Sequence, residues 1–448
     1  MTVDDRSVLW HVGQSLRLGT PLAFSHLAVM GMTATDILMM GWLGADALAA
    51  GALAGHTIGI LFLIVHGISG AAAPLMARAL GGADRAAAHV LLRDGLWLGV
   101  GLGAAAGLAL WPIGLYLGWL GQPDTIALPA QAYARIALFN IPVAIVFSAL
   151  RSYAAVFGRP NLGLFVIVLG LIVNAAGNYA LMFGHFGLPR LELRGAAIST
   201  IVTEVFMVVV IVLILRQIPD LRAIVLRSYW PGRVGVSEIL RLGLPIGVMN
   251  FGEIGVFQAA TFAIALFGAA QVAGHAVAME CAGVAFAVPL ALRQAAEIRI
   301  GYYAGAGDGA ALRRAARAII LAGAIAGVLQ AILFWSGRDL IAGLFLDPGS
   351  SQNEAAFAAA VSMLLAIAAF QIADGPQQVF NGVLRGLKDT RWPMIILLAG
   401  NWLIGAPLGL FLAFVAGLQG VGMWIGLATG IALTAAALGM RLRRHREF

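Results

Sequence analysis

Long apolar segments, separated by short polar ones, follow one another along the whole sequence. A membrane-spanning helix needs about 20 consecutive apolar residues, and the pattern contains twelve segments of that kind. Lipid offers the backbone no hydrogen-bond partners, so such segments must be helical. We expect helices near residues 15–39, 47–77, 90–117, 127–156, 160–184, 193–217, 236–264, 273–303, 314–336, 354–384, 391–415 and 421–441.

The composition agrees with this pattern. The chain has 448 residues, of which 61% are hydrophobic and 11% are charged, and its mean hydropathy is +0.92. A soluble protein of this length cannot bury so much apolar surface, so the class is polytopic membrane protein. The first residues lack a basic stretch followed by a short apolar core, so we expect no cleavable signal peptide.

The basic residues predict how the helices are oriented. The net charge is +7, but the basic residues are scattered singly between apolar segments, which indicates membrane topology and not nucleic-acid binding. If the N-terminus is cytoplasmic, 24 of the 28 Lys and Arg residues fall on the inner side. This bias predicts an even number of crossings with both termini in the cytoplasm.

The second half of the sequence repeats the first half at an offset of 224 residues. "LRLGTP" from Leu16 matches "LRLGLP" from Leu240, and "GGADRAAA" from Gly81 matches "GAGDGAAL" from Gly305. Six expected helices lie between the repeats, so both halves have the same orientation and an axis along the membrane normal should relate them. We therefore expect an all-α membrane protein with twelve helices in two six-helix lobes related by pseudo-two-fold symmetry.

The repeat also predicts the domain organisation. Two parallel bundles that rock against each other can expose a central site to alternate sides of the membrane, which is a transporter architecture. Pro21 and Pro245 occupy matching places early in the two lobes and are either hinges or helix starts at the membrane interface. The expected parts are a cytoplasmic segment 1–14, an N-lobe 15–217, a cytoplasmic linker 218–235, a C-lobe 236–441 and a cytoplasmic tail 442–448.

Acidic residues inside the apolar segments are the first candidate site residues. An ionised acid costs several kcal/mol when it faces lipid, so it should face the protein interior or water. Glu253 and Asp374 lie deep in their segments without a basic neighbour along the chain, and Asp36 lies nearer the outer end of the first segment. Each could hold a proton, a sodium ion or a cationic substrate in turn. Glu204 and Glu280 could instead bond to neighbouring helices.

A second polar set lies in the N-lobe. Asn174 and Asn178 are four residues apart and share one helical face, and Thr200 follows in the next helix. Together with Asp36, their oxygens could coordinate a small cation, or they could form hydrogen bonds between helices. Glu297 is of another kind, because Arg293 lies four residues before it at the spacing of a structural ion pair.

Aromatic residues accompany the C-lobe acids. Phe257 lies four residues after Glu253 on the same helical face, and Phe286 follows one helix later. An aromatic face stabilises a bound organic cation by about 0.5–2 kcal/mol, so the functional interpretation is a contact with a cationic substrate. The alternative is ordinary packing against lipid, the more frequent environment of a membrane phenylalanine.

Several motifs together resemble one known family. The stretches "NAAGNY", "RGAAIST", "GEIGVFQ" and "GLKDTRWPM", in this order, are similar to those of the multidrug and toxic compound extrusion (MATE) family, and its NorM-like branch fits best. The resemblance covers nearly the whole chain. It implies a twelve-helix, two-lobed fold in the bacterial inner membrane, and export of organic cations such as dyes, fluoroquinolones and aminoglycosides in exchange for sodium ions or protons.

The resemblance also implies roles for particular residues. Some members carry tyrosines where this sequence has Phe370 and Phe286, so a π-face contact is expected there and a hydroxyl ligand is not. The implied N-lobe cation site, with sodium among its ions, consists of Asp36, Asn174, Asn178 and Thr200. The implied C-lobe site, for the coupling ion and for the substrate, consists of Glu253, Asp374, Phe286 and Phe370. Phe257 is added to the expected substrate contacts because of its spacing from Glu253. We expect no resident cofactor, a monomer in contact with lipid, and cationic drugs and dyes as substrates.

Two other classes remain as alternatives. A flippase for lipid-linked precursors has a related fold, but that function needs a strongly cationic central cleft. An intramembrane enzyme needs a paired nucleophile and base or a set of metal ligands, and neither pattern is present. The sequence also lacks a P-loop, because the "GVGLGAAAG" stretch has no following Lys-Ser or Lys-Thr. Energy for transport would therefore come from an ion gradient.

Overall fold

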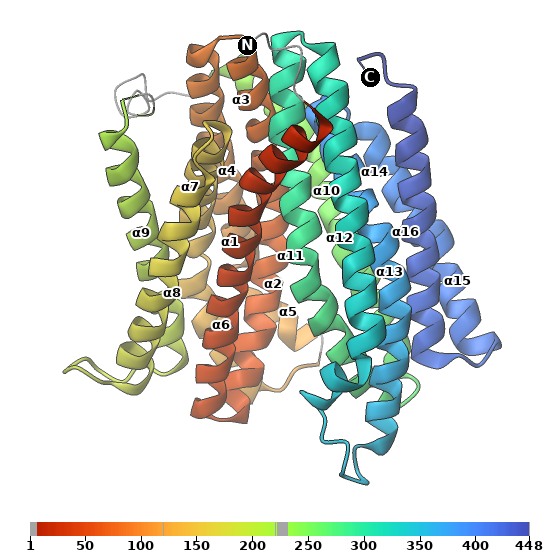
Figure 1. Cartoon of the computed structure of the whole chain (residues 1–448). Coiled ribbons are helices and arrows are strands. Elements are labelled where there is room, and N and C mark those ends of the chain that lie inside the picture. Colours follow the sequence, from red (N-terminus) through yellow and green to blue (C-terminus); the bar gives the residue numbers. More distant parts are fainter. Residues whose placement is uncertain (1–6, 120, 220, 222–231, 448) are drawn as a thin grey trace. The chain divides into compact units, whose positions relative to one another are not determined.

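The computed structural model describes residues 7–119, 121–219, 221 and 232–447, in which helices are joined by short turns (Figure 1). Within these ranges eleven helices are long and apolar enough to cross a membrane. A further pair, α6 (Asp124–Ala137) and α7 (Asn140–Val156), is bent by 43° and makes twelve crossings if it counts as one. Pro142 lies at this bend and has no N–H to continue the helical ladder. The expected twelve-helix fold is confirmed.

The chain divides into two compact units. Unit 1 comprises Met1–Ala23, Gly81–Ala83 and Val248–Phe448, and unit 2 comprises Phe24–Leu80 and Asp84–Gly247. Unit 2 holds α2 (Ala45–Gly70), most of α3 (Ala72–Gly81), α4 (Arg85–Leu110), α5 (Ile113–Trp119), α6, α7, α8 (Pro160–Phe183) and α9 (Leu193–Gln217). Unit 1 holds α11 (Ala269–Ala306), α12 (Gly309–Gly343), α13 (Glu354–Gly386), α14 (Arg391–Leu398), the π-helical segment η3 (Ala399–Gly405), α15 (Ala406–Leu410), the π-helical segment η4 (Phe411–Val415) and α16 (Gln419–Arg443).

Two helices begin in one unit and end in the other. Helix α1 (Val8–Leu43) changes from unit 1 to unit 2 after Ala23, and α10 (Arg233–Ala265) changes from unit 2 to unit 1 after Gly247. Each change falls two residues after the proline of that helix, Pro21 or Pro245. The compact units therefore contain most of the two expected lobes but exchange the first turns of α1 and α10. Most of the expected linker 218–235 and the first six residues lie outside the described residues.

A buried clamp holds the first turns of α1 in unit 1. Arg299 on α11 donates hydrogen bonds to the backbone oxygen of His11 at 2.7 Å and to Ser15 Oγ at 3.0 Å. His11 and Ser15 are almost completely buried. In unit 1 the start of α1 and the end of α16 lie at the same end of the helices (Figure 1), as an even number of crossings requires.

The repeat seen in the sequence returns in local backbone geometry. Asp84 and Asp308 lie 224 residues apart, and each caps a helix by accepting a 2.8 Å hydrogen bond from the backbone N–H three residues on. Gly44 and Gly268, at the same spacing, precede α2 and α11 with φ values of 123° and 97°. Such values favour glycine because it lacks a Cβ. The two halves thus share turns as well as helices.

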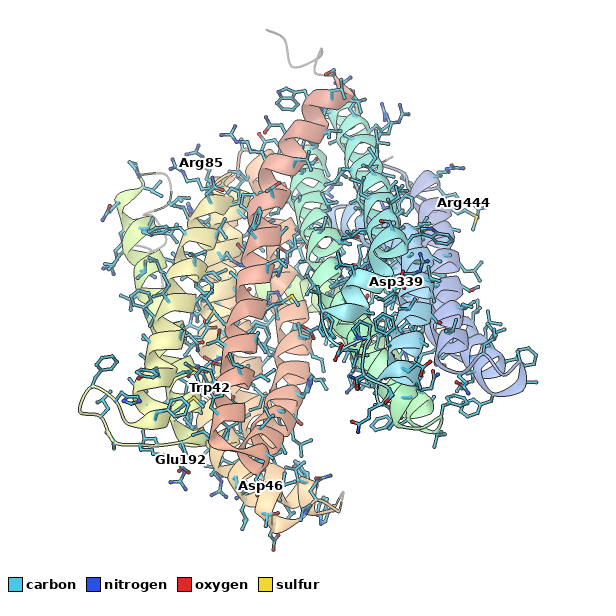
Figure 2. The ribbon with its side chains drawn as sticks, turned by 60° about the horizontal axis from the view of Figure 1, so that its bottom comes forward. Trp42, Asp46, Arg85, Glu192, Asp339 and Arg444 are labelled. Carbon is cyan, nitrogen blue, oxygen red and sulfur yellow. The ribbon has the colours of Figure 1, made fainter. Side chains whose placement is uncertain are left out.

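Each unit has its own apolar core. In unit 2 the core contains Ile141, Ile145 and Met182, and in unit 1 it contains Met363 and Trp424. Figure 2 shows Arg85 at one end of unit 2, and Asp46 and Glu192 at the opposite end, so charged groups mark both ends of the apolar helices.

Candidate functional site

The two deep acids of unit 1 lie on different helices and share one partner. Glu253 is on α10 and half-buried, and Asp374 is on α13 and 1% exposed. The side-chain amide of Gln378, also on α13, donates to Glu253 Oε1 at 3.0 Å and to Asp374 Oδ1 at 3.4 Å. Asp374 Oδ2 is buried without a hydrogen-bond partner. The structure therefore brings these two predicted residues together as an acid pair.

The basic partner of the acid pair comes from another helix. Arg293 on α11 donates from Nη1 to Gln378 Oε1 at 2.8 Å. Its Nε lies 3.8 Å from Glu297 Oε1, so the expected ion pair between these two residues is confirmed. Arg385 on α13 shares the same carboxylate at 3.0 Å. The sequence reveals no base near the acids along the chain, yet one lies a single amide group away.

The backbone before Glu253 is also fixed. Trp402, in the π-helical segment η3, donates its indole N–H to the carbonyl oxygen of Gly252 at 2.9 Å. A π-helical segment inside a helix often marks a functional site. One crossing next to the acid pair thus alternates between α-helix and π-helix, in the order α14, η3, α15 and η4.

Three aromatic rings pack together in unit 1. The ring centroids of Phe257, Phe370 and Trp424 lie 5.8–6.1 Å apart. Phe370 is 5% exposed and Trp424 is fully buried. Both rings belong to the apolar core, so neighbouring side chains cover the ring of Phe370. Phe286 lies on α11 and is half-buried.

A buried histidine holds this aromatic group. The indole N–H of Trp424 donates to His275 Nδ1 at 3.2 Å, and His275 Nε2 lies 2.9 Å from Thr261 Oγ1. Because the indole can only donate, His275 Nδ1 must accept, which leaves the hydrogen of the neutral ring on Nε2. Sequence analysis missed Trp424 and His275, since neither has a motif around it.

The predicted polar set of the N-lobe lies within unit 2. Asn178 on α8 donates to Asp36 Oδ1 on α1 at 2.5 Å. Asn174 lies one turn before Asn178, and both amides are fully buried. Thr200 on α9 donates to Ala196 of its own helix at 3.0 Å, while its neighbour Ser199 donates to the backbone oxygen of Asn174 at 3.2 Å. The structure joins Asp36 to Asn178, and Ser199 makes the bond from α9 to α8.

Oxygen atoms in this set suit a small hard cation. Asn174 Oδ1 and Asn178 Oδ1 are buried without hydrogen-bond partners, and such ions prefer oxygen ligands. Tyr133 on α6 is buried within electrostatic range of Asp36 and was missed from the sequence. No group of three or more His, Cys, Asp or Glu residues able to hold a metal occurs among the described residues. The donor set of this group is therefore made of amide and carboxylate oxygens.

The two acids without an assigned role behave differently. Glu204 on α9 has Arg151 on α7 as its opposite charge within electrostatic range, and Arg151 is buried. Glu280 on α11 is exposed. Glu204 thus has an opposite charge nearby, although its Oε2 atom has no hydrogen-bond partner among the described residues.

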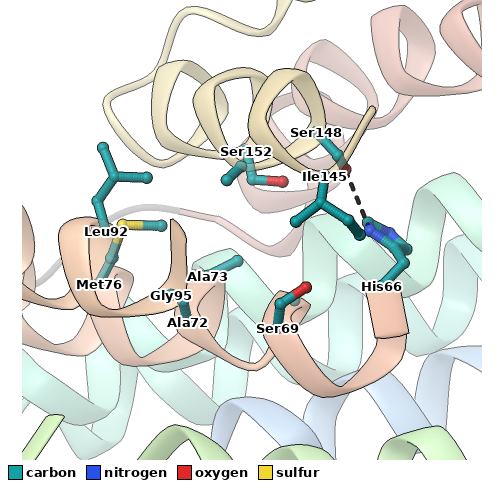
Figure 3. Close-up of a pocket in the computed structure, with 12 residues that line it drawn as sticks. His66, Ser69, Ala72, Ala73, Met76, Leu92, Gly95, Ile145, Ser148 and Ser152 are labelled. Carbon is teal, nitrogen blue, oxygen red and sulfur yellow. Dashed lines mark hydrogen bonds between the residues drawn. The ribbon is translucent and has the colours of Figure 1, made fainter. Parts of the chain in front are cut away.

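A small, mostly apolar pocket in unit 2 is lined by other residues (Figure 3). It is lined from α2, α3, α4 and α7, and Ser148 Oγ lies 3.2 Å from His66 Nδ1 within it. Its cavity volume is about 20 Å³, which is room for roughly one water molecule. None of the predicted site residues lines this pocket, and its volume is too small for a drug-sized molecule.

The fold and the buried acids define a helical membrane transporter with charged groups in its interior. The MatE family matches residues 21–180 and 245–411, and these two matches start 224 residues apart. The chain therefore belongs to the MatE family of multidrug and toxic compound extrusion (MATE) transporters.

Individual relatives support this assignment along the whole chain. The probable multidrug resistance protein NorM of Pseudomonas aeruginosa is 40% identical, over 95% of this chain and 88% of its own length. The protein of the same name from Agrobacterium fabrum is 34% identical, over 98% of this chain and 96% of its own. A mutant of the Vibrio cholerae MATE transporter VcmN has a TM-score of 0.87 at 19% identity, covering 98% and 99% of the two chains. The chain is thus a multi-pass membrane protein of the NorM-like multidrug efflux group.

Proposed function

We propose that this transporter exports organic cations across the bacterial inner membrane in exchange for sodium ions or protons. The observation that carries the proposal is the acid pair of unit 1, in which Glu253 and Asp374 share the amide of Gln378. Buried carboxylates attract cations, and Asp374 has an oxygen without a hydrogen-bond partner. A coupling ion and a cationic drug would therefore compete for the same oxygens.

Because the coupling ion and the drug compete for the acid pair, binding of one releases the other, and this exchange drives the transport cycle. A drug enters from the cytoplasm and contacts Glu253 and Asp374, with Phe257, Phe286 and Phe370 supplying aromatic faces as the packing opens. An entering proton or sodium ion then neutralises the acids and weakens drug binding on the outer side. The membrane potential contributes about 2.3 kcal/mol per charge per 100 mV. Asp36, Asn174, Asn178 and Thr200 form a second seat for the coupling ion in unit 2.

Alternating access would come from rocking of two lobes, with Pro21 and Pro245 as hinges. Each proline removes one backbone hydrogen bond from its helix and so weakens it locally. The position of both prolines two residues before a change of unit supports this role. We further propose lobes at 15–217 and 236–441, cytoplasmic termini and a monomeric transporter.

The test is dye efflux in inverted membrane vesicles, with sodium and proton gradients imposed separately. Glu253→Gln and Asp374→Asn should each abolish gradient-driven dye transport. Glu192→Gln is the matched control, because Glu192 is exposed in the turn before α9 and should transport normally. Unchanged efflux in both acid variants would rule out the role assigned to the pair. The gradient that drives the wild-type chain identifies the coupling ion.

Asp36→Asn separates the two seats. It leaves the acid pair intact and removes the charge next to Asn178, so the ion dependence of transport should change while drug binding persists. A flippase would instead move a lipid-linked precursor and no cationic dye. That outcome would replace the antiporter proposal.

A further inference from the structure

The acid pair belongs to a larger buried cluster of charges in unit 1. Gln378 joins it to Arg293 at 2.8 Å, Arg293 pairs with Glu297 at 3.8 Å, and Glu297 pairs with Arg385 at 3.0 Å. Arg293, Glu297 and Arg385 are each less than 10% exposed. The chain of contacts is continuous, so these groups share one electrostatic environment.

The boundary of this cluster is clear on the three helices that form it. Arg299 also lies on α11, but it bonds to His11 and Ser15 of α1. Glu280 on α11 is exposed. Asn381 adds a neutral contact by accepting from Arg385 Nε at 3.1 Å. The cluster on α10, α11 and α13 therefore contains three carboxylates and two guanidinium groups.

Charge balance in this cluster restricts what it can bind. With every group ionised the net charge is −1, and an arginine stays charged even when it is buried. Uncompensated buried charge is costly, so the cluster is most stable when it holds one added positive charge. A monocation gives neutrality, whereas a dication leaves an excess charge of +1.

We propose that Arg293 sets the charge selectivity of this transporter: held against the acid pair through Gln378, it makes the site prefer monocationic over dicationic ligands. This inference rests on the proposed function, because it concerns the ligands of the same acid pair. Arg293 acts through Gln378 and does not need to touch the ligand. One side-chain amide separates its guanidinium from the two carboxylates, close enough for one charge to change relative affinities on the order of tenfold.

The test compares two related fluorescent dyes, ethidium with one positive charge and propidium with two. Binding to the purified full-length chain in lipid nanodiscs is measured by fluorescence anisotropy at fixed pH and ionic strength. The quantity compared is the ratio of the two dissociation constants, which cancels a general loss of affinity. The wild-type chain should prefer ethidium.

A series of variants changes the cluster charge in steps. Arg293→Gln takes it to −2 and should move the ratio toward propidium by about tenfold. Arg293→Gln combined with Glu297→Gln returns the charge to −1 and should restore the wild-type ratio. Gln378→Glu also gives the cluster a net charge of −2, but it keeps the Arg293–Glu297 ion pair. If Arg293→Gln does not fold, this variant tests the same shift of the ratio toward propidium.

The outcomes separate this inference from the proposed function. If the wild-type chain binds both dyes and the −2 variants keep its ratio, Arg293 does not set charge selectivity. If the double variant keeps the shifted ratio although its cluster charge is again −1, the cluster charge does not set the selectivity and the inference is overturned. If the wild-type chain binds neither dye, the antiporter proposal fails and the inference fails with it.

Discussion

Replacing Trp424 by phenylalanine tests how the aromatic core of unit 1 is held together. Trp424 on α16 is fully buried, and its indole N–H donates to His275 Nδ1 on α11 at 3.2 Å. Phenylalanine keeps an aromatic ring but cannot donate, so the nitrogen of His275 loses its partner. The smaller ring also leaves space beside Phe257 and Phe370.

The expected loss of stability is about 2 kcal/mol. Hydrogen bonds between membrane helices contribute about 0.6 kcal/mol on average and up to about 1.7 kcal/mol. The space left by the smaller ring adds roughly 1 kcal/mol. Since every 1.4 kcal/mol is a factor of ten, local opening of this core should become about 30-fold more frequent.

The protein carries its own reporter for this opening. Cys281 is the only cysteine, and it is buried in the same core as Trp424. The rate at which a thiol reagent labels Cys281 under native conditions therefore reports how often the core opens. Trp335→Phe is the matched control, because Trp335 is 63% exposed and its replacement should change the rate little. If Trp424→Phe is labelled no faster than Trp335→Phe, the hydrogen bond to His275 contributes no stability and the reasoning is refuted.

Two further predictions concern glycine packing and helix caps. A Cβ at Gly81 would collide with the backbone oxygen of Tyr302, so Gly81→Val should sharply reduce the yield of monodisperse protein in gel filtration, whereas Gly101→Val, where the space is open, should not. Asp84→Ala and Asp308→Ala each remove a 2.8 Å cap, and each should lower the melting temperature by the equivalent of about 1 kcal/mol. A serine at the same position should restore most of it, and a large difference between the two sites would argue against equivalent roles in the repeat.

The sequence predicts the helices well because the apolar length needed to cross lipid leaves a strong periodic signal. It also predicts the acids, because a charge in an apolar segment is conspicuous. Gln378 could have been found as well, since it lies four residues after Asp374 on the same helical face.

Partners on other helices could not be predicted in this way. Arg293 lies 85 residues from Gln378 along the chain, and its position depends on how α11 packs against α13. The burial of Phe370 against Trp424 depends equally on packing. Sequence patterns report which face of a helix is polar, but they do not report which helix it meets.

The route of α1 and α10 through both units makes the two halves of the chain depend on each other to fold. If the chain were cut between α9 and α10, the first fragment would keep the turns of α1 that complete unit 1, and the second would keep the turns of α10 that complete unit 2. Neither fragment alone would contain a whole unit. The halves should therefore be unstable when made separately and regain structure when made together. Each half of the chain therefore needs the other half to complete its own compact unit.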